Sequence, residues 1–171
     1  IPPETTQTLH QTVAQTIEQV YPDDPLQAAQ LMYHWGQAAN QERECFYAQV
    51  AGTHSAAQYA NEDALLYLTR AYELTSATAL AQQYEIVLVR EEIYALVGNS
   101  ALRKADLDLL AELAEAMGQA EQHAEIALRQ ANYALLTSDY SAAYKFAQAA
   151  VEQALSLIHI SEPTIRITIS Y

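Results

Sequence analysis

The chain has 171 residues, of which 51% are hydrophobic, and its formal net charge is -13. Four Gly and five Pro supply little of the turn chemistry that β-hairpins need, so the composition predicts an all-α protein. The negative charge argues against nucleic acid and anionic membranes as partners, because attraction to Lys and Arg dominates binding to both.

A single cysteine, Cys45, excludes an internal disulfide and suits a reducing compartment. No apolar run reaches the length of a membrane span, and no cationic leader followed by an apolar run opens the chain. We therefore expect a cytoplasmic protein. Because the sequence begins at Ile1 without a Met, we also expect it to be an internal piece of a longer protein.

Two helices are predicted in the first 40 residues. Thr5 or Thr6 can cap the first, whose apolar residues recur at helical spacing up to Val20. Asp24 followed by Pro25 is a typical helix start, and it opens a second helix. That second helix carries small and apolar residues four and then three positions apart: Ala28, Met32 and Trp35.

The segment Tyr59–Leu74 carries the clearest packing pattern. Ala64, Leu68 and Ala71 share one helical face, and their small size lets a neighbouring helix approach closely. These offsets resemble the second helix of a tetratricopeptide (TPR) unit. Twelve positions before Ala64, where the resemblance implies a small residue in the first helix, the chain has Gly52.

The helix preceding this segment is predicted over Glu42–Tyr59, with Phe46, Val50 and Ala57 as its apolar residues. Asn61 and Ser100 are the expected caps of the helices that they open. Further helices are predicted from Ser76 to Val97, from Ser100 to Gly118, from Glu121 to Leu136 and from Tyr140 to Ala154.

The TPR pattern continues in these later helices with longer spacing. Ala105 and Ala143 are the expected counterparts of Ala64, and Ala147 and Ala150 complete the offsets after Ala143. Successive counterparts lie further apart than the period of about 34 residues of a TPR unit. The resemblance therefore implies an α-solenoid, a TPR-like right-handed superhelix of about four antiparallel helix pairs over residues 1–154.

Residues 155–171 differ in character, because Ile and β-branched residues alternate there after an Ala-rich helical chain. Periodicity alone would predict an edge strand. However, Leu155–Thr164 matches the in-frame translation of a transposase adapter used in preparing sequencing libraries. We therefore predict that residues 155–171 are a non-native tail that contributes nothing to the fold.

No motif for catalysis, metal or cofactor binding stands out. Pairs of histidines at the spacing of three or four that aims two rings at one metal are absent. Neighbouring carboxylates such as Glu91 and Glu92, or Asp106 and Asp108, point in different directions on a helix. Four scattered glycines cannot form a phosphate-binding loop. We expect no catalytic residue, no metal and no cofactor.

Taken together, segments such as LHQTVAQTIEQVYPDDPLQAAQLMYHWGQAA, YANEDALLYLTRAYEL and IALRQANYALLTSDYSAA resemble the repeat region of large bacterial signalling ATPases. Such STAND-type proteins are often fused to cyclase or DNA-binding regions. In TPR proteins, residues flanking the small residue of each first helix face a concave, peptide-holding surface. If Gly52, Ile93 and Ala131 are equivalent, the resemblance implies that this surface carries Gln49, Thr53, Arg90, Tyr94, Leu128 and Asn132.

Three functions follow as hypotheses. The first is an interaction module that binds a protein, a peptide or the switch domain of its own parent. The second is an all-helical enzyme, which predicts close, buried carboxylates from different helices in a deep pocket. The third is a structural spacer without a ligand. A shallow open groove would favour the module.

The last helix pair is expected to expose an apolar face to a missing neighbour, because each unit of a repeat stack packs only against the adjacent ones. This face predicts self-association through the C-terminal end. Alternatively, Lys145, Glu152 and Gln153 form a polar cap there. The expected apolar residues are Leu128, Leu135, Tyr144, Phe146 and Val151.

Overall fold

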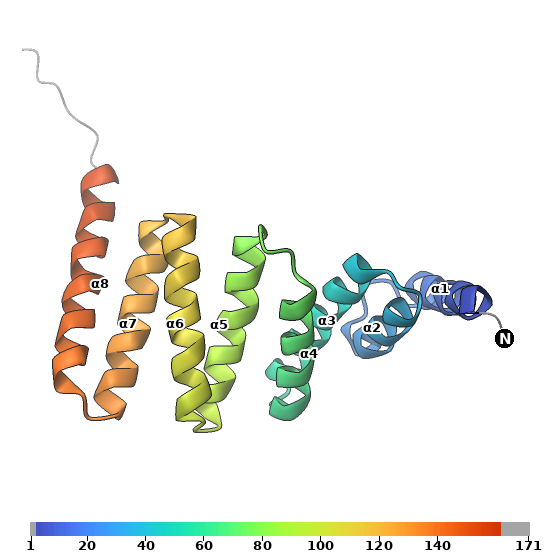
Figure 1. The fold of residues 1–171 in the computed structure, drawn as a ribbon, viewed down its shortest axis with the longest axis horizontal. Helices are drawn as coiled ribbons and strands as arrows, with labels where there is room; N and C mark the ends of the chain where they lie inside the picture. The colour runs from blue at the N-terminus through green and yellow to red at the C-terminus, as the bar shows by residue number, and fades with distance from the viewer. Residues whose placement is uncertain (1–2, 162–171) are drawn as a thin grey trace, which may run out of the picture. The chain divides into compact units, whose positions relative to one another are not determined.

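The structure is a computed structural model that describes residues 3–161. Within that range it contains α-helices, one 3-10 turn and no strand, which confirms the all-α prediction (Figure 1). None of these helices combines the length and hydrophobicity needed to cross a bilayer. The elements are α1 (Pro3–Val20), η1 (Pro25–Gln27), α2 (Ala28–Gln37), α3 (Gln41–Ala57), α4 (Asn61–Leu74), α5 (Leu80–Leu96), α6 (Ser100–Met117), α7 (Ala120–Leu136) and α8 (Tyr140–Ser161).

Short polar side chains cap the N-termini of several helices. The sequence predicts such caps, but not always at the residue that forms them. The Asp24 carboxylate accepts a hydrogen bond from the Leu26 amide at 3.0 Å, which confirms the predicted start. Asn99, rather than Ser100, caps α6 by accepting from the Leu102 amide. Asn61 is the first residue of α4 and no side chain caps that helix, so the expected cap there is wrong.

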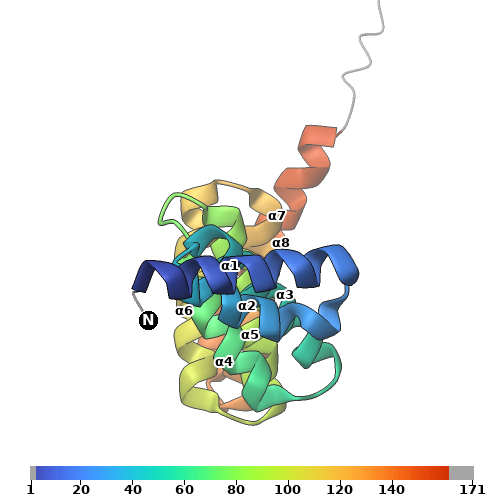
Figure 2. The ribbon, with the colours of Figure 1, turned by 90° about the vertical axis from the view of Figure 1, so that its right-hand side faces the viewer.

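The described residues form two compact units, one up to Leu109 and one from Leu110 onward. In the first unit each helix from α1 to α5 packs against the next in sequence, and α3 also contacts α5. Figure 2 views the N-terminal end of this unit, with α1 lying in front of α2. In the second unit α7 packs against α8. Packing between sequence neighbours is typical of helical repeats.

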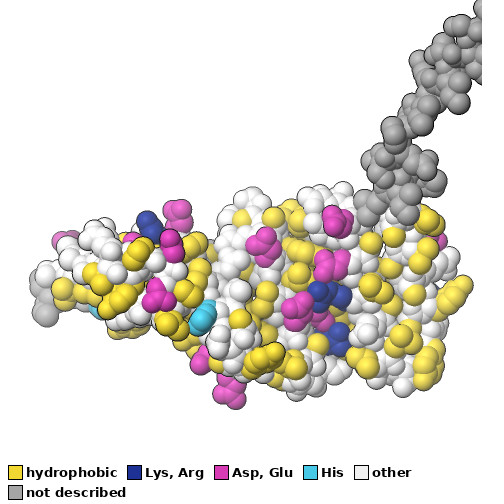
Figure 3. Space-filling view, turned by 180° about the vertical axis from the view of Figure 1, so that it is seen from behind, with side chains coloured by type: hydrophobic (Ala, Val, Ile, Leu, Met, Phe, Trp, Pro, Cys, Tyr) yellow, Lys and Arg dark blue, Asp and Glu magenta, His cyan; other side chains and the backbone are white. Residues whose placement is uncertain are grey.

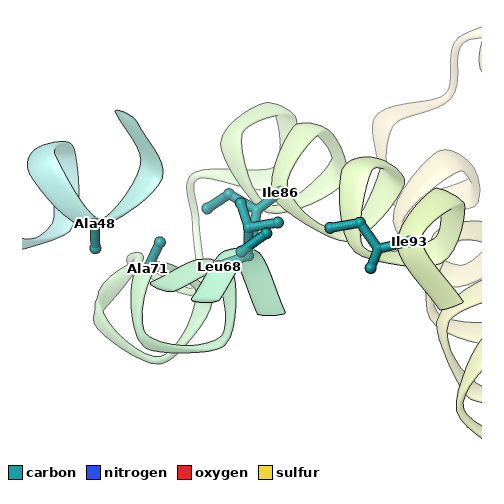
Figure 4. Packing of buried hydrophobic residues seen from close by; sticks show 6 residues of the cluster. Ala48, Leu68, Ala71, Ile86 and Ile93 are labelled. Atoms are coloured by element: carbon teal, nitrogen blue, oxygen red, sulfur yellow. The ribbon is translucent and has the colours of Figure 1, made fainter. Parts of the chain in front are cut away.

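The core of the first unit forms where α3, α4 and α5 meet. Ala64, Leu68 and Ala71 are fully buried, which confirms the close-packing face predicted for α4. Leu68 lies against Ile86 of α5, and Ala71 lies on the side of α4 that approaches α3 (Figure 4). The small residues allow the helix backbones to approach, and the larger Leu68 fills the space between them.

Four residues that the sequence pattern places in the core are exposed instead. The buried face of α3 consists of Cys45, Ala48, Ala51 and Gly52, whereas Phe46 and Ala57 are exposed. A helix that crosses its neighbour this closely buries small side chains and leaves an aromatic ring outside. On α6 and α8, the expected small core residues Ala105 and Ala147 are exposed too.

Two buried ion pairs join α5 to the first turns of α6. Arg90 donates to the Asp106 carboxylate, with 2.7 Å between Nε and Oδ2, and Arg103 donates to Glu91 at the same distance. The side chains of Asp106 and Glu91 are 5% and 1% exposed. Because each helix supplies one cation and one anion, the two pairs are reciprocal and fix the register between these helices.

The last helix is longer than predicted. The sequence places its end at Ala154, whereas α8 continues to Ser161. Residues 162–171, which make up most of the suspected tail, lie outside the described residues. That residues 155–171 are non-native stays a prediction.

A pair of histidines joins α1 to α2, although sequence spacing alone does not connect them. The Nδ1 atoms of His10 and His34 are 2.8 Å apart, and the Tyr33 ring packs edge-on against both imidazoles. At this distance one Nδ1 donates and the other accepts, so the pair holds one proton between the two atoms. Burial, followed by the nearby His10, lowers the pKa of His34.

This pair predicts that acid weakens the N-terminal packing. Because the pKa of His34 is lowered on folding, the unfolded chain binds more protons below its ordinary pKa of about 6.5. The contribution of His34 to the free energy of unfolding is therefore present above about pH 6.5 and is lost as the pH falls below it. We expect the wild-type chain to unfold at a lower urea concentration at about pH 5.5 than at about pH 7.5. In His34→Gln this decrease in the urea midpoint should be smaller. His54→Gln, on α3, is the control and should retain the wild-type dependence. Equal slopes for all three proteins would contradict this role of the pair.

Candidate functional site

The exposed face of α3 carries the most distinctive surface of the first unit. Glu42, Phe46, Gln49, Val50 and Thr53 follow each other at helical spacing on one side of α3, away from the buried Ala48. Glu42, Phe46 and Thr53 are exposed, whereas Gln49 and Val50 are half-buried. We call these five residues the α3 ridge. Phe46 is its largest member, and the residue is 54% exposed. An aromatic ring held in solvent on a rigid helix is a ready contact for another molecule.

Three hollows surround this ridge, and Phe46 lines all of them. The first hollow, of about 390 Å³, lies between α3 and the α1–η1 connection around Asp23. The second, of about 520 Å³, follows the ridge from Phe46 to Ala57 and reaches Pro25. The third, of about 570 Å³, lies towards the α4–α5 connection around Thr75. All three are open to solvent, and they lie on different sides of one aromatic ring.

A hydrogen-bonded network shapes the wall of the first hollow. Glu18 of α1 accepts from Trp35 Nε1 at 2.8 Å and from Arg43 at 3.1 Å. Arg43 also lies over the Trp35 ring, 5.5 Å from its centroid. Burial, with a smaller contribution from the Glu18 carboxylate, raises the pKa of Tyr47 to about 12. This wall is therefore held in place before any ligand arrives.

The wall of the third hollow is held by polar contacts between α3, α4 and α5. Gln82 of α5 donates to Gln49 of the ridge at 3.0 Å and contacts the buried Cys45 sulfur at 3.7 Å. Cys45 also lies 3.4 Å from the Thr75 hydroxyl. The thiol thus acts as a packing residue beneath the hollow.

The structure brings together two of the six residues that the TPR resemblance implies for a binding surface. Gln49 and Thr53 both line the second hollow. Arg90 instead is paired with Asp106 and stacked on the Tyr72 ring at 5.4 Å, so its side chain is only 12% exposed. Tyr94 is half-buried on α5. The other two, Leu128 and Asn132, are exposed on α7 in the second unit.

Sequence reasoning did not select Phe46 as a site residue. The available signal was its position three residues before Gln49, which places both on one face of α3. The apolar pattern of α3 instead predicts Phe46 in the core, because large apolar residues are usually buried.

In the second unit, the apolar face expected at the C-terminal end is only partly solvent-exposed. Leu128, Tyr144 and Val151 are exposed, as is Leu135, while Phe146 is half-buried. Self-association through these residues stays a prediction.

The enzyme hypothesis predicts close, buried carboxylates from different helices in a deep pocket. In the described part of the chain, no three His, Cys, Asp or Glu side chains converge as metal ligands. The buried carboxylates Glu91 and Asp106 do come from different helices, but each is bonded to an arginine, and the three hollows have other linings.

In comparisons with known proteins, no family model, curated protein or solved structure matches the chain.

Proposed function

We propose that this chain is a TPR-like repeat segment that acts as a protein-interaction module and binds a peptide segment along the α3 ridge. One observation carries the proposal: three hollows meet at a single exposed aromatic ring, Phe46, on a wall preorganised by the Glu18 and Gln82 contacts. Rigid aromatic anchors contribute disproportionately to binding free energy. Thr53 and the side-chain N–H groups of Gln49, whose Oε1 already accepts from Gln82, are polar groups on the same face that can bond to a peptide backbone.

The resemblance to signalling ATPases supports a place for this segment in the sensor or regulatory part of such a protein, or of a transcriptional regulator. Its partner would then be a protein, a peptide or the switch domain of its own parent. A spacer without a ligand remains the main alternative. The enzyme hypothesis has less support, because the buried carboxylates Glu91 and Asp106 are each bonded to an arginine and line none of the three hollows.

Selection from a random peptide library tests the proposal. We expect the purified chain to enrich peptides whose binding, measured by fluorescence anisotropy, weakens at least about tenfold in Phe46→Ala, a loss of about 1.4 kcal/mol. Leu66→Ala is the matched control, because Leu66 is an exposed apolar residue on α4 outside the three hollows. Failure to enrich any peptide, or binding that is insensitive to Phe46→Ala, would favour the spacer.

A further inference from the structure

The three hollows differ in polarity. The second hollow is mainly apolar around Phe46, Val50 and Pro25. A large aliphatic or aromatic side chain placed there would bury apolar surface against Phe46, and such burial favours the complex. The apolar contact explains attraction to a hydrophobic side chain but does not select the partner's charge.

Charge on the flanks of Phe46 supplies that selection. Four carboxylates and one guanidinium line the first and third hollows: Glu18, Asp23, Asp24, Glu42 and Arg43. Glu18 is paired with Arg43, so these two charges largely cancel. Asp23 and Asp24 then lie on one side of Phe46 and Glu42 lies on the other. A segment that crosses the ring therefore meets negative charge at both ends.

The charge of the sequence as a whole has the same sign. Asp and Glu outnumber Lys and Arg by 21 to 8 in the sequence, and they also predominate over the face drawn in Figure 3. Negative charge of this size attracts cations over roughly a Debye length and repels anionic segments. It also disfavours a second copy of this acidic chain as the occupant. Complementarity thus points to a basic partner.

We infer that the α3 ridge binds a cationic peptide segment in which a large apolar side chain, seated on Phe46, is flanked on both sides by Lys or Arg. This inference rests on the proposed peptide-binding function and adds the chemical class of the partner. Because exposed carboxylates act partly through long-range attraction, binding should weaken as salt is raised.

Three synthetic peptides of equal length test the inference. Each carries one central Leu, flanked on both sides by Lys, by Gln or by Glu, and binding is followed by fluorescence anisotropy at about 50 mM and about 300 mM salt. We expect the Lys peptide to bind at least about tenfold more tightly than the Gln peptide at low salt, with a smaller ratio at high salt. The Glu peptide should bind most weakly.

Matched variants separate local charge from total charge. The double variant Asp23→Asn with Glu42→Gln should weaken Lys-peptide binding about fivefold or more and leave the Gln peptide unchanged. Glu62→Gln with Asp63→Asn removes the same charge from the exposed first turn of α4, outside the hollows, and should have a smaller effect. Equal effects of the two double variants would overturn the assignment to these hollows.

The outcomes also distinguish this inference from the function on which it rests. Library peptides that need Phe46 but show no preference for basic residues would overturn the inference and retain the interaction module. The inference would also be overturned if the three synthetic peptides bound equally well, or if none of them bound. If no peptide from either source depends on Phe46, both proposals fail.

Discussion

Asp106→Ala is expected to lower the free energy of unfolding by about 3–5 kcal/mol, the largest effect that we predict for a single substitution in this chain. The Arg90 side chain is 12% exposed, and its guanidinium donates to both oxygens of Asp106. Removal of the carboxylate would leave a cation buried beside the Tyr72 ring without its anion. Urea unfolding followed by circular dichroism measures the loss.

Asp108→Ala is the matched control, because Asp108 lies on the same helix and pairs with Lys104 at 2.6 Å while more than half exposed. Exposed pairs contribute about 0–1 kcal/mol, so this variant should unfold nearly as the wild type does. Arg90→Leu combined with Asp106→Leu removes both charges and should recover much of the stability lost in Asp106→Ala. A loss below about 1 kcal/mol in Asp106→Ala would show that the pair is more hydrated than its burial indicates.

The ion pairs mark a limit of prediction from sequence. Arg90 was expected on a binding surface because the TPR resemblance aligned it with Gln49, and helical periodicity could not reveal its partner. Asp106 lies on the next helix, and which residue of α6 faces Arg90 depends on the rotation of both helices. The His10–His34 contact could not be predicted for the same reason: it joins residues 24 positions apart on different helices, and it depends on how those helices are rotated.

Helices were predictable because capping residues and small-residue spacing are local signals. The Asp24–Pro25 start and the Ala64, Leu68 and Ala71 face could be read within one or two turns of chain. The buried face of α3 could not be predicted from such local signals. That helix has small residues around most of its circumference, and its apolar residues define no single stripe. Tertiary packing selected Ala48 and Gly52 for the core and left Phe46 outside.

Gly52 and Leu68 make the contact that determines how closely α3 and α4 approach. A Cβ added at Gly52 would lie 2.6 Å from Leu68 Cγ, 2.8 Å from its Cδ2 and 3.1 Å from the Leu68 amide nitrogen. The first two distances are too short for carbon atoms, and the third involves helix backbone. Relief of the overlap therefore requires α3 and α4 to separate or Leu68 to leave its rotamer.

Gly52→Ala should consequently lower the free energy of unfolding by about 1–3 kcal/mol, although Ala favours a helix over Gly by about 1 kcal/mol. Gly36→Ala is the control, because a Cβ there would meet only the side-chain end of Glu44, nearest at 3.0 Å, and no backbone of a neighbouring helix, so the variant should lower stability less than Gly52→Ala does. Leu68→Ala tests the cause, since it removes the atoms that a Cβ at position 52 would strike. On its own it should cost about 2–5 kcal/mol. Combined with Gly52→Ala, it should cost clearly less than the sum of the two single changes, because the added methyl then occupies part of the vacated space. Strict additivity in urea unfolding would mean that the close approach of α3 and α4 at Gly52 is not what limits their packing.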